Sequence, residues 1–459
     1  MGVQTLQRSW QDQDILRYLG REAPRYTSYP SAHHFSDLSP QTYGSWLETL
    51  TPDQSVGLYL HVPFCPQMCY FCGCNTQITK RYDPVASYVD CLIREINMAG
   101  QWIAFKPRVH SVHFGGGSPG ILEPADMGRI FETLHARFEI APDAEVSIEL
   151  DPRRITAVKA QTYAALGFNR VSMGVQDTQT EVQVAINRVQ PIEVIQRAAD
   201  LLRSYGLNAL GIDLVYGLPM QTRAGLEATL KDVKGLDADR ISAFSYAHVP
   251  WFKKHQTLIR DEDIPGVEAK ADYFLTLSHA LEAQGYQSLG IDHFAKPDDG
   301  LCKAQAHRTL RRNFMGYTDM PNDRLIAFGA SSISELDDGI AQNIPQSTAY
   351  QNTIGQGTLA TKRGWAYHAD DKLRKAVISD LMCYFEADVA AILARFGYPA
   401  DYFDAELTAL SPFIRDGLVS VRGGHVRFHS PLKMLARSVA CIFDLYAQEG
   451  GTNRYSRVA

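Results

Sequence analysis

The alternation of strand and helix patterns between residues 56 and 248 constrains the fold of this chain more than any other feature. Apolar, β-branched runs occupy 56–63, 109–117, 145–152, 170–176, 207–217 and 240–248. Amphipathic stretches such as PVASYVDCLIREINMAG and IEVIQRAADLLRSYG separate them. This alternation predicts an α/β fold with a parallel sheet built of βα units. Six units fit a partial (β/α)6 barrel, although a doubly wound open sheet has the same local pattern.

Polar and glycine-rich residues gather at the carboxyl ends of these expected strands. A cysteine cluster follows the first strand and GGGSP (115–119) the second; later strands end in Glu149 and Asp151, Gln176, Asp213, and Tyr246 with Ala247. Barrels of βα units carry their active sites at this end of the sheet. The placement therefore favours the barrel over the open sheet and predicts that these residues converge on one site.

Four of the eight cysteines fall within ten residues: Cys65, Cys69, Cys72 and Cys74. Such a cluster in a long chain points to metal, not to a disulfide framework. The spacing Cx3Cx2C can wrap three corners of an iron–sulfur cube and leave the fourth iron open. Structural zinc, which usually takes two separated ligand pairs, and a four-cysteine cluster are weaker alternatives. Cys74 stands too close to Cys72 to reach the fourth iron.

Composition excludes several other classes of protein. The net charge of −6 gives no electrostatic footprint for nucleic acid, and 45% hydrophobic residues can fill a large core. No run approaches the ~20 apolar residues of a membrane span, and the first 20 residues do not resemble a signal peptide. We expect a cytoplasmic protein.

Three regions are expected along the chain. Residues 1–50, with the irregular segment PRYTSYP (24–30), form an extension that closes over the active site. Residues 51–368 form the barrel, and 369–459 form a small, mainly helical domain. The sequence LVSVRGGHVRF predicts a hairpin in this last domain, with the two glycines at its turn.

Several motifs resemble a known family. The Cx3Cx2C loop after the first strand, with an aromatic residue before its last cysteine, resembles the radical S-adenosylmethionine (SAM) superfamily. PRYTSYP, LYLHVPFC, CYFCGCN, FGGGSP, SIELDP, FNRVSMGVQD and IDLVYGLP resemble, in this order, the oxygen-independent coproporphyrinogen III oxidase family. This resemblance runs from about residue 22 to the end of the chain.

The resemblance implies an oxidoreductase of haem and porphyrin biosynthesis. It would convert two propionates of coproporphyrinogen III to vinyl groups, giving protoporphyrinogen IX, through a 5′-deoxyadenosyl radical. The implied cofactors are a [4Fe–4S] cluster, whose open iron binds SAM, and a second SAM. The implied electron donor is a reduced flavodoxin or ferredoxin, and we expect a monomer. The alternatives are a haem chaperone or an enzyme acting on another tetrapyrrole.

The resemblance also assigns residues by motif. Cys65, Cys69 and Cys72 would bind the cluster, and Tyr59 would join them in the catalytic group. SAM would contact Tyr59, Phe71, Gly116, Gly117, Ser118, Glu149, Gln176, Arg188, Asp213, Ala247 and Ile333. The candidates for the substrate are Arg25, Tyr26, Arg311 and Arg312, with Tyr29 and Phe314 as an apolar wall. The sequence departs from the family pattern at Ser118, Met315, Asp319 and Tyr384.

Overall fold

The computed structural model describes residues 17–321, 324–448 and 455–458. The first sixteen residues of the predicted N-terminal extension lie outside these ranges. No helix in the described ranges is both long and apolar enough to cross a membrane.

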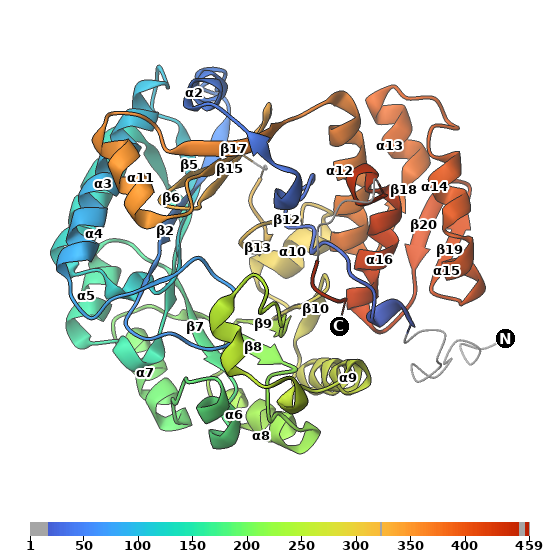
Figure 1. The fold of residues 1–459 in the computed structure, drawn as a ribbon, viewed down its shortest axis with the longest axis horizontal. Helices are drawn as coiled ribbons and strands as arrows, with labels where there is room; N and C mark the ends of the chain where they lie inside the picture. Colours follow the sequence, from blue (N-terminus) through green and yellow to red (C-terminus); the bar gives the residue numbers. More distant parts are fainter. Residues whose placement is uncertain (1–16, 322–323, 449–454, 459) are drawn as a thin grey trace.

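Six parallel strands form the centre of the molecule, and helices cover their outer face (Figure 1). The strands are neighbours in chain order: β2 (Ser55–Val62), β5 (Arg108–Gly116), β6 (Glu139–Leu150), β7 (Arg170–Gln176), β8 (Ala209–Tyr216) and β9 (Arg240–Ser245). The main covering helices are α3 (Asp83–Gln101), α4 (Pro124–Arg137), α5 (Ala157–Ala165), α7 (Ile192–Ser204) and α8 (Arg223–Lys234). The predicted partial (β/α)6 barrel is confirmed.

The periodicity of each element explains why it forms. Seven of the eight residues of β2 are buried, because the strand has neighbours on both sides and side chains on both faces. Helix α3 buries Val85, Val89, Leu92 and Ile96, which recur three or four residues apart and so share one face.

The sheet continues beyond the six strands on both sides to a total of 13 strands. On one side β14 (Leu325–Phe328) pairs parallel with β2, followed by the antiparallel strands β15 (Ile333–Leu336), β16 (Gly339–Asn343) and β17 (Thr361–Ala366), and by β1 (Ser36–Asp37). On the other side the hairpin β10 (Gln287–Leu289) and β11 (His293–Ala295) pairs with β9. A separate hairpin, β12 (Arg311–Asn313) and β13 (Gly316–Thr318), follows α10 (Gly300–Ala306).

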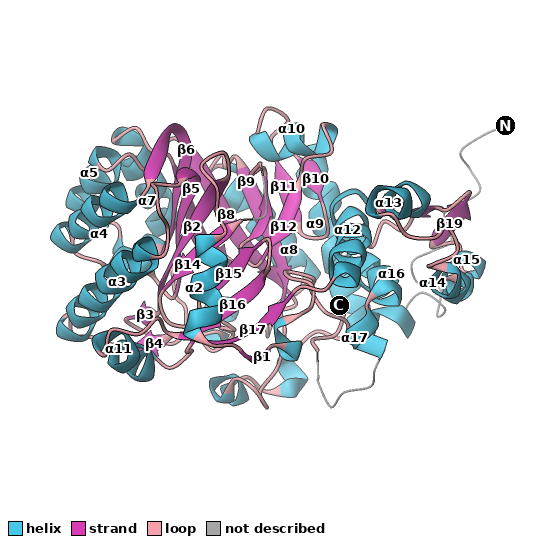
Figure 2. Cartoon of the chain, turned by 90° about the horizontal axis from the view of Figure 1, so that it is seen from above, coloured by secondary structure: helices cyan, strands magenta, loops and turns pink. Residues whose placement is uncertain are grey.

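The C-terminal part packs beside the barrel (Figure 2). Its helices are α12 (Ala369–Tyr384), α13 (Val389–Phe396), α14 (Asp404–Ala409), α15 (Ser411–Arg415), α16 (Ala436–Ala440) and α17 (Leu445–Gln448). The predicted hairpin is confirmed as β19 (Val419–Arg422) and β20 (His425–Phe428), with Gly423 and Gly424 at positive φ. The N-terminal segment contacts this part: Tyr18 stacks on Phe413, and the hydroxyl of Tyr26 donates to Asp444 over 3.0 Å.

Candidate active site

The cysteine loop leaves the carboxyl end of β2 and folds back on itself. Cys65 lies in the short strand β3 (Phe64–Cys65), which pairs with β4 (Gln77–Ile78). The N–H of Cys72 donates to the carbonyl of Cys69 over 3.2 Å. Burial raises the pKa of the Cys65 thiol to about 12, and the charges of Cys72 and Cys69 raise it further. The loop therefore brings the three thiols into mutual electrostatic range.

Side chains from the rim of the barrel hold the carbonyl groups of this loop. Asn187 donates to Met68 over 2.8 Å, His255 to Cys72 over 2.7 Å, Gln256 to Phe71 over 2.9 Å and Lys253 to Cys74 over 2.9 Å. These residues follow β7 and β9 in the sequence. Sequence reasoning missed all four, because a side chain that donates to a distant carbonyl leaves no spacing signal in the chain.

The donor set suits an iron–sulfur cluster and not a single ion. Within residues 17–321, 324–448 and 455–458, no three His, Cys, Asp or Glu side chains are gathered closely enough to hold one metal ion. In a [4Fe–4S] cluster each thiolate binds a different iron, so the ligands stand further apart. Arg188 points one guanidinium nitrogen at Cys69 Sγ over 3.6 Å, and its buried Nε has no partner. A cation with an unused donor beside these thiols fits a negatively charged cluster.

Cys74 acts on Cys72. The interaction with the Cys74 side chain lowers the pKa of Cys72 to about 6, while the pKa of Cys74 itself is raised. The thiolate is the form that binds metal. Cys74 therefore favours the thiolate form of Cys72, which is one of the three predicted ligands.

Tyr59, Glu149 and Asp213 form a second group on β2, β6 and β8; Glu149 is next to last in its strand, whereas Tyr59 and Asp213 lie within theirs, so the predicted position of Asp213 at a strand end is wrong. The Tyr59 ring stacks on His113 at 5.8 Å, and its hydroxyl lies 3.0 Å from His61 Nδ1. Glu149 lies 3.3 Å from His113 Nε2 and accepts from the Gly116 N–H over 3.2 Å. Its charge also acts on Asp213. His113 links Glu149 to Tyr59, and His61 contacts the Tyr59 hydroxyl and the Asn75 carbonyl; neither histidine was identified from the sequence.

The remaining predicted SAM contacts lie around these two groups. Gln176 and Arg188 both cover Gly174, where an added Cβ would lie 2.6 Å and 3.0 Å from their nitrogens. Phe71 packs against the apolar cluster that includes Val215 and Tyr246. The carbonyl of Ala247 accepts from Gln256 over 3.3 Å, whereas Ile333 begins β15, two strands away from β2.

The glycine turn after β5 packs against the start of the cysteine loop. A Cβ at Gly117 would lie 2.8 Å from the Pro63 carbonyl carbon, and one at Gly116 would meet the His61 ring at 2.6 Å. Ser118 donates its N–H to the Phe64 carbonyl over 2.9 Å. These glycines therefore allow the turn and the loop to approach each other closely.

The pKa of Asp213 is raised to about 7 by burial and by the charge of Glu149. Between about pH 4 and 7 the folded protein keeps a proton that the unfolded chain releases, so stability falls as the pH rises through this window. Asp213→Asn should therefore increase the free energy of unfolding of the cluster-free protein by on the order of 2 kcal/mol at pH 8, and little near pH 4. Thermal melting at the two pH values measures this. An equal effect at both would contradict the assignment.

A buried group of charges lies beyond β8 and β9. The guanidinium of Arg312 lies 3.4 Å from Asp292, and its Nε donates to the carbonyl of Arg25 over 3.3 Å. Arg25 donates to the carbonyl of Ser245, at the end of β9, over 2.9 Å. Lys270 donates to the carbonyl of Tyr246 over 3.1 Å.

Arg437 completes this group by binding the carbonyls of Ala23 and Pro24. Burial lowers the pKa of Arg437 to about 9, and the neighbouring charges of Arg25 and Arg312 lower it further. Arg312 and Arg25 act on the carboxylate of Asp292, which also contacts His293 at 2.7 Å, and Arg25 in turn acts on Lys270 and Arg437. Among the described residues of this group the buried cations therefore outnumber the carboxylate. Buried charge of one sign needs a partner of the other, so the arrangement suits an anionic ligand.

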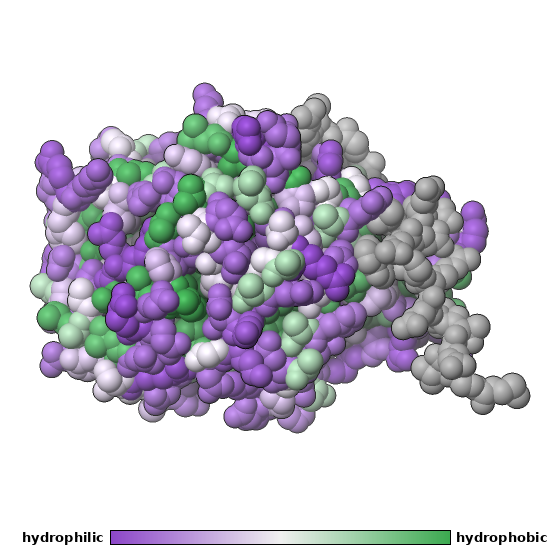
Figure 3. Space-filling model, turned by 90° about the horizontal axis from the view of Figure 1, so that it is seen from below, coloured by the Kyte–Doolittle hydropathy of each residue, from purple (hydrophilic) through white to green (hydrophobic). Residues whose placement is uncertain are grey.

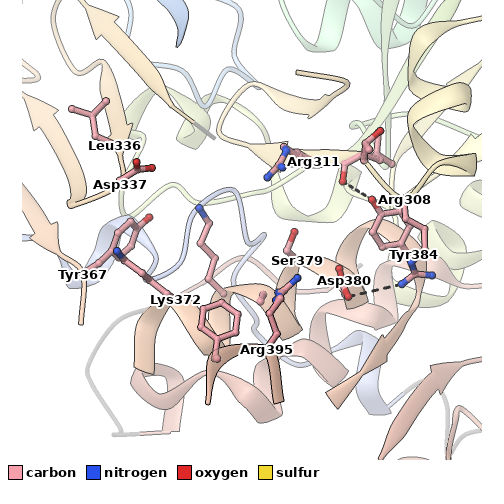
Figure 4. Close-up of a pocket in the computed structure, with 15 residues that line it drawn as sticks. Arg308, Arg311, Leu336, Asp337, Tyr367, Lys372, Ser379, Asp380, Tyr384 and Arg395 are labelled. Atoms are coloured by element: carbon pink, nitrogen blue, oxygen red, sulfur yellow. Dashed lines mark hydrogen bonds and ion pairs between the residues drawn. The ribbon is translucent and has the colours of Figure 1, made fainter. Parts of the chain in front are cut away.

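Two predicted substrate residues lie elsewhere. Tyr26 binds Asp444, as described above. Arg311 is next to Arg312 in the sequence, but adjacent residues of a strand point to opposite faces. Arg311 lines a separate cavity of about 400 Å³ with Arg308, Lys372 and Arg395 (Figure 4).

Of the four departures from the family pattern, Ser118 is described above, Met315 and Asp319 lie in or just after the β12–β13 hairpin, and Tyr384 ends α12. Met315 packs beside Tyr59 and Phe314. Asp319 lies 3.8 Å from Arg240, and the hydroxyl of Tyr384 donates to the Leu310 carbonyl over 2.9 Å. Met315 therefore lies near the candidate residue Tyr59, and Tyr384 lines the same cavity as the candidate residue Arg311.

Comparison with known proteins agrees with this geometry. The radical SAM superfamily model matches residues 59–233. The chain is 42% identical over 428 residues to the oxygen-independent coproporphyrinogen III oxidase of Bradyrhizobium diazoefficiens, covering 93% of this chain and 95% of the relative. It is 39% identical over 463 residues to the enzyme of that name from Escherichia coli, covering both chains fully. The solved structure of Escherichia coli coproporphyrinogen III oxidase superposes with a TM-score of 0.88 at 37% identity, covering 93% of this chain and 100% of that one.

The βα barrel and its three-cysteine loop define a radical SAM enzyme, a class that uses a [4Fe–4S] cluster and SAM. Within that class, the chain belongs to the oxygen-independent coproporphyrinogen III oxidase family.

Proposed function

We propose that the protein converts two propionate side chains of coproporphyrinogen III to vinyl groups without oxygen. In each conversion the propionate releases CO₂, one hydrogen atom passes to the radical derived from SAM, and the one remaining electron passes to a one-electron acceptor. The names of the relatives support this activity and not the haem chaperone or another tetrapyrrole as substrate. The observation that carries the proposal is the surplus of buried positive charge around Asp292, since the substrate is an anion with several carboxylates.

For the cofactors, we propose Cys65, Cys69 and Cys72 as the ligands of the cluster, with two SAM molecules in contact with the residues assigned above. When bound, these groups supply an organic radical that can remove a hydrogen atom from the propionate β-carbon. Arg188 would balance the charge of the thiolates. Glu149 and Asp213 would accept hydrogen bonds from hydroxyl or ammonium groups.

For the substrate, we propose that Arg25 and Arg312 bind propionates at the ends of β8 and β9. The β12–β13 hairpin supports this placement, because Arg312 lies in the charged group while Phe314 contacts the Tyr59 ring edge-on at 4.7 Å. The hairpin therefore spans the space between the cofactor residues and the cations. The described part of residues 1–50 would close this space, since Arg25 contacts both β9 and Arg312.

Anaerobic turnover tests the proposal. The reconstituted protein, given dithionite, SAM and coproporphyrinogen III, should release two CO₂ and form protoporphyrinogen IX. Chromatography of the product, after its oxidation to the porphyrin, measures this conversion. SAM cleavage without a vinyl product would reject the substrate, and haem binding without SAM cleavage would favour the chaperone.

A further inference from the structure

A second cavity, of about 410 Å³, lies directly behind the cysteine loop. Its wall includes Pro66, which follows Cys65, and Thr79, whose N–H donates to the Cys65 carbonyl over 3.0 Å. Ser118, at the turn after β5, forms another part of the wall. One of the three predicted cluster ligands therefore stands immediately next to this cavity.

The cavity is positively charged. Its lining holds four cations and one carboxylate: Lys80, Arg81, Arg154 and Lys159 against Glu123. Arg81 is paired with Asp83, and Lys159 donates to the Gly120 carbonyl. Lys80 and Arg154 are exposed, and within the described residues their side chains make no hydrogen bond or ion pair. Their charge is therefore available to a partner.

We propose that these four cations bind an acidic one-electron carrier protein. Together they are called the docking surface below. This inference rests on the proposed function, because cleavage of SAM needs an electron that the chain does not supply. The carrier loses one electron and the enzyme gains it, while no bond forms or breaks. Electron transfer slows steeply with distance, so a carrier bound beside Cys65 is well placed to reduce the cluster.

Position, and not charge alone, distinguishes this surface. The cavity of Figure 4 is also lined by more cations than carboxylates, but Asp337 in its wall accepts from Gln54, which precedes β2. The cysteine loop follows the other end of β2, and an eight-residue strand is roughly 25 Å long. Figure 3 shows one face of the molecule, on which hydrophobic and hydrophilic side chains are interspersed.

A matched pair of variants tests the proposal. Lys80→Glu/Arg154→Glu reverses two charges of the docking surface, and Lys372→Glu/Arg395→Glu makes the same change in net charge at two exposed residues of the Figure 4 cavity. With reduced flavodoxin as the acidic carrier at low salt, the first variant should lose at least about tenfold in kcat/KM for the carrier and in binding affinity by calorimetry. The second should stay within about twofold of the parent protein.

Dithionite separates the possible failures. It reduces the enzyme without docking, so both variants should keep the dithionite-driven rate and the iron content of the parent protein. Equal flavodoxin-driven rates and affinities for all three proteins would overturn the docking surface while leaving the proposed function intact. Failure of the parent protein with dithionite would instead reject the proposed function, and the calorimetric comparison would still decide whether the surface binds the carrier.

Discussion

Cys69→Ala should abolish both the cluster and the turnover of coproporphyrinogen III, with a loss of at least ~10³-fold, or about 4 kcal/mol in transition-state stabilisation. Cys69 is buried among the other thiols and is the one that Arg188 contacts. Because Cys69 is one of the three proposed ligands, removing it would leave only two of the thiolates that we propose hold the cluster. Iron and sulfide content and the visible absorption of the reconstituted protein measure the first loss, and the anaerobic assay measures the second.

Cys91→Ala is the matched control for this prediction. Cys91 lies on α3, and its thiol faces the carbonyl of Gln351 at 3.9 Å, away from the cysteine loop. Its loss should spare both cluster and activity. A full complement of iron in Cys69→Ala would show that another residue is the third ligand, and Cys74 would be the first to examine because it lies in the same loop and lowers the pKa of Cys72.

The sequence predicted the parts of this structure that depend on local pattern. The six parallel strands were found because each is a buried apolar run, and the cysteine loop because Cx3Cx2C is a short-range spacing. Glu149 and Gln176 were expected at one edge because parallel strands bring their carboxyl ends together, and the structure places them at or next to the ends of β6 and β7, whereas Asp213 lies within β8. In each case a few adjacent residues contain the information.

The parts that were missed depend on contacts between distant segments. Lys270 and Arg437 lie on different helices, and only the fold brings them near Arg25. His113 was overlooked because it lies inside a strand of apolar character, where its link to Glu149 leaves no trace in the sequence. Arg311 and Arg312 were treated as one unit, and the alternation of a strand separated them.

Arg312→Gln should lower kcat/KM for coproporphyrinogen III by roughly 100-fold, because it removes a charge-assisted, largely buried contact for a carboxylate, worth about 2–3 kcal/mol. The side chain of Arg312 is 4% exposed. Among the described residues, Asp292 is the only carboxylate that forms an ion pair with it. SAM cleavage with dithionite should continue, since Arg312 lies apart from the cysteine loop. Product formation and 5′-deoxyadenosine release, measured in the same reaction, separate the two effects.

Arg311→Gln is the control, because it removes the same charge from the neighbouring residue on the opposite face of β12. Its kcat/KM should change by less than about threefold.

Loss of Arg312 leaves Asp292 as a buried carboxylate, which alone can destabilise the protein. Asp292→Asn in the same chain removes that charge, so Arg312→Gln/Asp292→Asn should melt near the parent protein and still turn over slowly. If the double variant recovers full kcat/KM, Arg312 serves folding and the substrate carboxylates bind elsewhere. If both neighbours lose activity equally, the propionates reach both faces of the hairpin and the charged group around Asp292 is not their specific site.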